Sequence, residues 1–104
     1  MNVLLVFCTF PDADTARQIG TMLVESQLAA CVNVIPGIES IYRWEGSVQH
    51  DSEVIALLKT TADNFPRLEA RLLDTHPYDT PEIVSVRPES VDGSYADWIR
   101  ASCR

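Results

Sequence analysis

The sequence has little positive charge. Lysine and arginine together number 8, against 15 aspartates and glutamates, so the formal net charge is −7. Such a chain repels the phosphate backbone of nucleic acids and the anionic surface of membranes. We therefore expect neither a nucleic-acid partner nor a membrane partner.

Cysteine is scarce, and the chain has no long hydrophobic run. The three cysteines are Cys8, Cys31 and Cys103, and none has CxxC spacing. An odd number without that spacing argues against a disulfide framework and a zinc ribbon, and it fits a reducing compartment. The N-terminal stretch MNVLLVFCTF lacks the basic region of a secretory signal, and no apolar run is long enough to span a bilayer. These features predict a cytoplasmic protein.

The common catalytic signatures are also missing. The sequence contains no GxSxG, GxGxxG or Walker motif. An acylphosphatase-like enzyme would need an arginine-lined anion cradle near the N-terminus, where only Arg17 occurs, inside a predicted helix. A nucleophilic pair of Cys8 with His76 has no evident third member to orient it. We therefore predict that the protein is not an enzyme.

The residue pattern predicts a single domain, residues 1–104, that alternates strands with helices. Strand, helix, strand, strand, helix, strand is the ferredoxin-like βαββαβ pattern of the α+β class. Right-handed crossovers then give an antiparallel sheet in the order 4-1-3-2, with both helices on one face. The predicted elements are strand Val3–Thr9, a helix from about Ala13 to Leu28, strands Cys31–Trp44 and Ser47–Thr60, a helix from about Ala62 to Thr75, strand Glu82–Arg87 and a short C-terminal helix containing Tyr95, Trp98 and Ile99.

The second and third strands form an unusually long hairpin. Each has about fourteen residues, against roughly five or six in a typical strand, and Pro36-Gly37 predicts a bend or bulge in the second strand. A domain this small cannot cover so long a ribbon with its own helices. Tyr42 and Trp44, at the far end of the hairpin, therefore need a partner or a bend over the core. The hairpin predicts an oligomer.

The predicted topology gathers three metal-ligand residue types at one end of the sheet. Cys8 ends the first strand, His76 follows the second helix, and Glu82 begins the last strand, while Cys31 falls at the opposite end. A thiolate, an imidazole and a carboxylate suit a soft or borderline divalent ion such as copper or zinc. The alternative is structural: a buried thiol, a histidine that caps a helix and a solvated glutamate. The residues alone leave both interpretations open.

Five segments are long and unusual enough to be compared with known families: CTFPD (8–12), LAACVNVIPGIESIYRWEG (28–46), ALLKTT (56–61), HPYDTPEI (76–83) and YADWI (95–99). Together they resemble the CutA family of divalent-cation tolerance proteins. The resemblance implies a tight homotrimer similar to the PII signalling proteins, with the hairpin arms making contacts between subunits. It also implies binding of divalent metal ions, Cu(II) among them, and no settled catalytic activity.

The resemblance also implies a role for individual residues. Cys8 matches the family cysteine implicated in copper binding, and His76 matches one histidine of a consecutive pair found in some members. Thr75, a poor copper ligand, stands where those members have the other histidine. Glu82 matches the glutamate of the family motif PYxTPE and is the predicted third ligand.

A cleft between subunits is the second site that the resemblance implies. Its lining residues here are Trp44, Glu53, Lys59 and Tyr78. The cleft supports an alternative function, in which a PII-like signalling or scaffold trimer binds a small molecule or a partner protein between its subunits.

Overall fold

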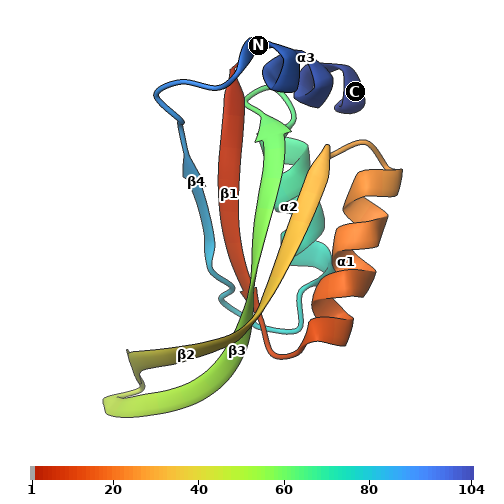
Figure 1. Cartoon of the computed structure of the whole chain (residues 1–104). Helices are drawn as coiled ribbons and strands as arrows, with labels where there is room; N and C mark the ends of the chain where they lie inside the picture. The colour runs from red at the N-terminus through yellow and green to blue at the C-terminus, as the bar shows by residue number, and fades with distance from the viewer. Residues whose placement is uncertain (1) are drawn as a thin grey trace.

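The computed structural model describes residues 2–104, and in them one antiparallel sheet has the strand order β2-β3-β1-β4 (Figure 1). This is the predicted order 4-1-3-2 counted from the other edge, so the predicted α+β topology is confirmed. The elements are β1 (Val3–Phe10), α1 (Ala13–Glu25), β2 (Cys31–Trp44), β3 (Ser47–Thr61), α2 (Phe65–Thr75), β4 (Ile83–Val86) and α3 (Gly93–Ser102).

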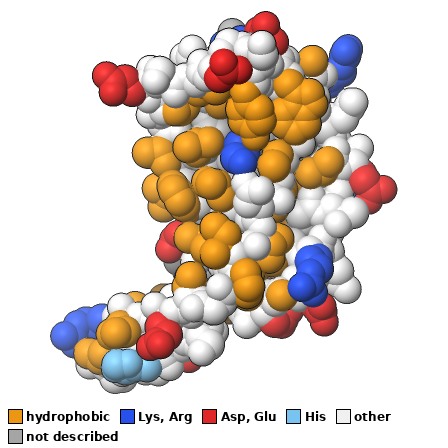
Figure 2. Space-filling model, viewed as in Figure 1, with side chains coloured by type: hydrophobic (Ala, Val, Ile, Leu, Met, Phe, Trp, Pro, Cys, Tyr) orange, Lys and Arg blue, Asp and Glu red, His pale blue; other side chains and the backbone are white. Residues whose placement is uncertain are grey.

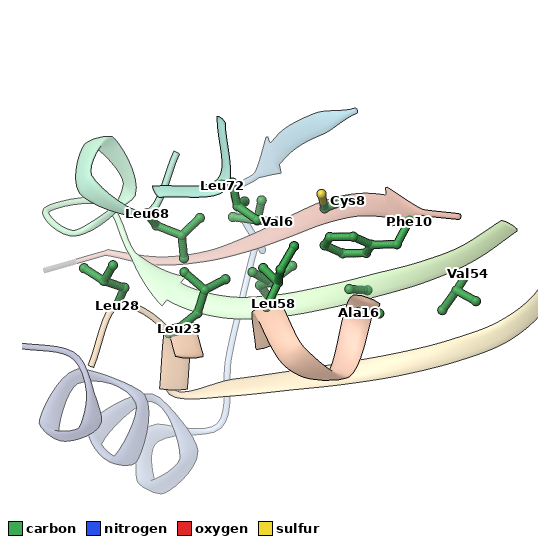
Figure 3. Close-up of a cluster of buried hydrophobic side chains, with 13 residues drawn as sticks. Val6, Cys8, Phe10, Ala16, Leu23, Leu28, Val54, Leu58, Leu68 and Leu72 are labelled. Atoms are coloured by element: carbon green, nitrogen blue, oxygen red, sulfur yellow. The ribbon is translucent and has the colours of Figure 1, made fainter. Parts of the chain in front are cut away.

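The hydrophobic core lies between one face of the sheet and the helices α1 and α2 (Figure 3). Alternate residues of β1 and β3 point into it, because successive strand side chains face opposite sides of a sheet. Gly20 of α1 lies against β2, where an added Cβ would come within 3.1 Å of the Val32 side chain. The helix α1 therefore packs closely on the sheet at Gly20. The core strand residues are Val6, Cys8, Phe10, Val54, Ala56 and Leu58.

Two predicted helix boundaries were wrong by about one turn. α1 ends at Glu25 rather than near Leu28, because Gln27 adopts a left-handed φ of 62°. α2 begins at Phe65 rather than near Ala62, with Asn64 at its N-cap. Apolar residues continue the helical spacing past both ends, so periodicity alone could not locate them.

The β2–β3 hairpin is a long curved arm that leaves the body of the molecule (Figure 1). A break in register between Ile35 and Ile38 marks a bulge, and Gly37 within it has a φ of 79°, which glycine adopts readily. The predicted bend at Pro36-Gly37 is therefore confirmed. The Cα radius of gyration is 14.1 Å, whereas a compact chain of this length would have about 13 Å. The arm accounts for the elongated shape.

The turn at the tip of the arm contains backbone strain that a substitution can relieve. Glu45 and Gly46 connect paired strands and have φ values of 50° and 82°. A glutamate in the left-handed region is unfavourable, whereas asparagine tolerates it. We expect Glu45→Asn to raise the free energy of unfolding by about 0.5–1 kcal/mol, measured by denaturant titration. Glu89→Asn, in an exposed loop without positive φ, is the matched control and should bring no gain. Equal gains in both variants would contradict the strain argument.

Candidate functional site

The three predicted metal ligands lie at one end of the sheet, where β1 ends and β4 begins. Cys8 of β1 pairs in register with Ile83 of β4, so Glu82 precedes the residue that pairs with Cys8. His76, at the C-cap of α2, approaches β1 with its Nε2 atom 2.8 Å from the Thr9 carbonyl oxygen. The topology thus brings the three residues to the same end of the molecule.

Cys8 is a fully buried thiol of the core (Figure 3). Its burial and, to a lesser extent, the charge of Glu82 raise the pKa of the thiol to about 12. The thiolate, which is the metal-binding form of cysteine, is therefore disfavoured near neutral pH.

Both ring nitrogens of His76 form hydrogen bonds within the protein. Nδ1 accepts a hydrogen bond from the Tyr78 backbone N–H at 3.1 Å, so Nε2 carries the proton and donates to the Thr9 carbonyl. The ring stacks on Phe10 with centroids 4.7 Å apart and lies 4.9 Å from the ring of Tyr78. Burial lowers the pKa of His76 and favours the neutral ring. The histidine joins the end of α2, the end of β1 and the loop formed by residues 77–82.

No three histidine, cysteine, aspartate or glutamate side chains between residues 2 and 104 are grouped so as to hold one metal ion. The assignment of Cys8, His76 and Glu82 as a ligand set therefore stays a prediction. Thr75 is not placed as a fourth ligand, since its hydroxyl donates a hydrogen bond to the Arg71 carbonyl at 2.8 Å. Any ion bound by the three predicted ligands requires the hydrogen bonds of His76 to rearrange.

A cavity of about 860 Å³ lies between the curved arm and loop 77–82, and we call it the acidic cavity. Carboxylates enter it from three segments, because the bulge in β2 turns the distal arm toward this loop. Three aromatic side chains, Tyr42, Trp44 and Tyr78, also line it. The carboxylates belong to Glu39, Asp51, Glu53, Asp79 and Glu82.

Two tyrosines hold carboxylates in the acidic cavity. The Tyr78 hydroxyl donates to Glu53 Oε2 at 2.8 Å, and the Tyr42 hydroxyl donates to Asp51 Oδ2. Burial and the bond to Glu53 raise the pKa of Tyr78, while the bond to Asp51 is the main cause of the raised pKa of Tyr42. Both hydroxyls therefore stay protonated and keep donating, which fixes the orientation of the two carboxylates.

Three of the four residues predicted for the cleft between subunits meet within one chain, and the cleft itself stays a prediction. Trp44, Glu53 and Tyr78 line the acidic cavity, but Lys59 lies on the opposite half of β3. Its Nζ atom is 3.8 Å from Cys31 Sγ, donates to Asn33 and lies 6.0 Å from the ring centroid of Tyr95. Tyr42 and Asp51 also line the cavity and were not among the predicted cleft residues, although the alternation of Tyr42 and Trp44 on β2 and of Asp51 and Glu53 on β3 was a usable signal.

The sheet face away from α1 and α2 carries many apolar side chains, and we call it the open sheet face. Figure 2 shows hydrophobic side chains gathered over it. Several are half exposed, including Ile35 (46%), Val84 (51%) and Val86 (43%). The strand register places its apolar members on one surface: Leu5, Phe7, Ile35, Ile55, Leu57, Val84 and Val86.

Among residues 2–104, no helix combines the length and apolar character needed to cross a membrane.

Comparison with known proteins gives consistent matches along nearly the whole chain. The family model described as CutA1 divalent ion tolerance protein matches residues 4–102. A relative from Thermus thermophilus named divalent-cation tolerance protein CutA is 47% identical over 96 residues, covering 92% of this chain and 93% of the relative. A second relative with that name, from Pectobacterium atrosepticum, is 38% identical over 103 residues, with 99% and 94% covered.

The solved structures agree with the sequence matches. The structure of the Thermus thermophilus divalent cation tolerance protein has a TM-score of 0.95 and 44% identity, covering 98% of this chain and 99% of that one. The names of other matches differ in the compartment that they state. One from Arabidopsis thaliana is called chloroplastic, and one from Archaeoglobus fulgidus is called periplasmic.

Proposed function

The chain belongs to the CutA1 divalent ion tolerance family, and on that premise we propose that it is a non-catalytic, homotrimeric protein that binds divalent cations, Cu(II) among them, in the cytoplasm. The observation that carries the metal assignment is the strand register, which places Glu82 next to Ile83, the partner of Cys8, while His76 bonds the carbonyl of Thr9. The three free cysteines support a reducing compartment.

To bind a metal ion at this site, Cys8 and His76 must first give up bonds that they make within the protein. Cys8 must lose its proton, and His76 must release the Tyr78 N–H or the Thr9 carbonyl to offer a nitrogen. Ligands that must be deprotonated make metal affinity depend on pH. Because the pKa of Cys8 is about 12, we expect the affinity to rise with pH throughout the neutral range.

A titration with Cu(II), and with Zn(II) as a redox-inert comparison, tests this assignment. We expect Glu82→Gln and Cys8→Ala each to weaken binding by about tenfold. Both changes avoid the hydrogen-bonded ring of His76, so the fold should survive. Glu89→Gln removes the same charge from an exposed loop outside the site and should bind like the wild type. Equal affinities in all four proteins, measured by calorimetry, would rule out this ligand set.

The trimer is supported by the open sheet face and by the arm. Contiguous exposed apolar patches of this kind mark interaction surfaces, and a face of alternate strand residues suits burial against another subunit. Val48 on the distal arm, outside the acidic cavity, is also more than half exposed (55%), so the arm offers a further apolar contact.

We also propose a second candidate, a PII-like signalling or scaffold trimer that binds a small molecule or a partner protein at the intersubunit cleft, to which Trp44, Glu53 and Tyr78 of the acidic cavity belong. The volume of about 860 Å³ favours a molecule larger than a metal ion. Thermal unfolding with a panel of cationic, neutral and anionic metabolites tests it. A ligand at a hundredfold excess over its Kd adds about 2.7 kcal/mol to stability. No shift with any compound would count against this candidate.

A further inference from the structure

The acidic cavity combines charge of one sign with aromatic surface. None of its lining residues is lysine, arginine or histidine, while five carboxylates and three aromatic rings face it. We propose that it binds an aliphatic polyamine, a flexible chain with two or more ammonium groups. The inference rests on the second candidate function, since it names the ligand class of that same cavity.

The spread of the carboxylates argues for an extended cation. Glu39 comes from β2, Asp51 and Glu53 come from β3, and Asp79 and Glu82 come from loop 77–82. No three of these acids are grouped for a single ion among the described residues. The cavity of about 860 Å³ is also far larger than one water molecule, which takes about 30 Å³ in the liquid. Separated charges in a roomy cavity match a ligand whose own charges are separated.

The aromatic residues explain why the cation should be organic. Trp44, Tyr42 and Tyr78 offer ring faces, and an ammonium group over such a face is attracted by the ring quadrupole. Ile41 and Pro77 add apolar surface to the cavity lining, which suits the methylene groups of a polyamine. A strongly hydrated inorganic ion would gain nothing from this apolar surface.

Part of the cavity is held in shape before any ligand binds. The Tyr78 hydroxyl fixes Glu53, and the bond from the Tyr78 N–H to His76 fixes the loop at Tyr78. A carboxylate has about four acceptor positions, so Glu53 can accept from an ammonium group while it keeps its bond to Tyr78. A preformed site of this kind reduces the ordering penalty of binding.

Calorimetric titration of the full chain with spermidine at low ionic strength tests the proposal. We expect Glu53→Gln to weaken binding by about tenfold and Trp44→Ala by about threefold or more. Glu53→Gln keeps an oxygen that accepts from the Tyr78 hydroxyl, and Trp44 is half exposed, so both variants should fold. Glu89→Gln loses the same charge outside the cavity and should bind spermidine like the wild type. Cadaverine should bind measurably, whereas the neutral 1,5-pentanediol should not.

Several results would overturn the proposal that the cavity binds a polyamine. They are no heat with spermidine, equal weakening by Glu89→Gln and Glu53→Gln, equal binding of the diol, or Mg²⁺ binding as tightly as spermidine with the same dependence on Glu53. If a neutral or anionic metabolite binds with dependence on Trp44 while spermidine does not, the ligand class is wrong and the second candidate stands. The metal titration on Cys8→Ala tests the leading function separately.

Discussion

Val84→Lys will leave the chain folded and reduce the proposed trimer to monomers. Val84 lies on the open sheet face with half of its side chain exposed, so in an isolated chain the lysine can reach water. Surface changes of this kind usually alter stability by no more than about 0.5 kcal/mol. In a trimer that buries this face, each lysine would be a charge without a partner, which costs about 3–5 kcal/mol per interface. Such a loss lowers the association constant of an interface by at least about a hundredfold.

Val24→Lys is the matched control for this prediction. Val24 is 40% exposed on α1, on the helix-covered side of the sheet, so its replacement should leave the assembly intact. Sedimentation equilibrium should give three times 11.6 kDa for the wild type and for Val24→Lys, and 11.6 kDa for Val84→Lys. Circular dichroism of the monomer confirms that it is folded. A monomeric wild type, or a Val84→Lys protein that remains trimeric, would contradict the assignment of the open sheet face.

The order of the elements and the sheet topology were predictable because each rests on local signals. Strand periodicity, the Pro36-Gly37 break and the turn at Glu45-Gly46 define the long hairpin, and handedness rules then leave one strand order. The structure has that order and that hairpin. Helix ends were less predictable, since the left-handed residue Gln27 ends α1 although the apolar spacing continues to Leu28.

The chemistry of the site was less predictable than its location. The sequence brings Cys8, His76 and Glu82 to one end of the sheet, but it cannot show that both nitrogens of His76 are already hydrogen-bonded. These bonds depend on backbone atoms, which carry no residue-type signal. Lys59 was grouped with Glu53 because the family resemblance implies that both line a cleft between subunits. They lie on opposite sides of the bulge, where the arm curves away from the body of the sheet.

His76→Ala will lower the free energy of unfolding by about 3 kcal/mol. The change removes the ring of a residue that is only 8% exposed, a ring that stacks on Phe10 and contacts the tilted ring of Tyr78. It also leaves the Thr9 carbonyl and the Tyr78 N–H without their partner. His76→Gln is the matched comparison, because its amide can still donate and accept, and it should lose about half as much. Denaturant unfolding at pH 7 measures both, and a loss below about 1 kcal/mol in His76→Ala would contradict the bridging role.

The same histidine should make stability depend on pH in a defined direction. Burial lowers the pKa of His76 below its ordinary value of 6.5, although the Thr9 carbonyl and the charge of Glu53 oppose the shift. The unfolded chain therefore binds a proton more readily than the native one, so the stability from the neutral ring is complete above pH 6.5 and is lost as the pH falls through the native pKa. The free energy by which the wild type exceeds His76→Gln should shrink between pH 7 and pH 5. A difference that stays constant or grows toward acid would contradict a lowered pKa of His76 in the native protein.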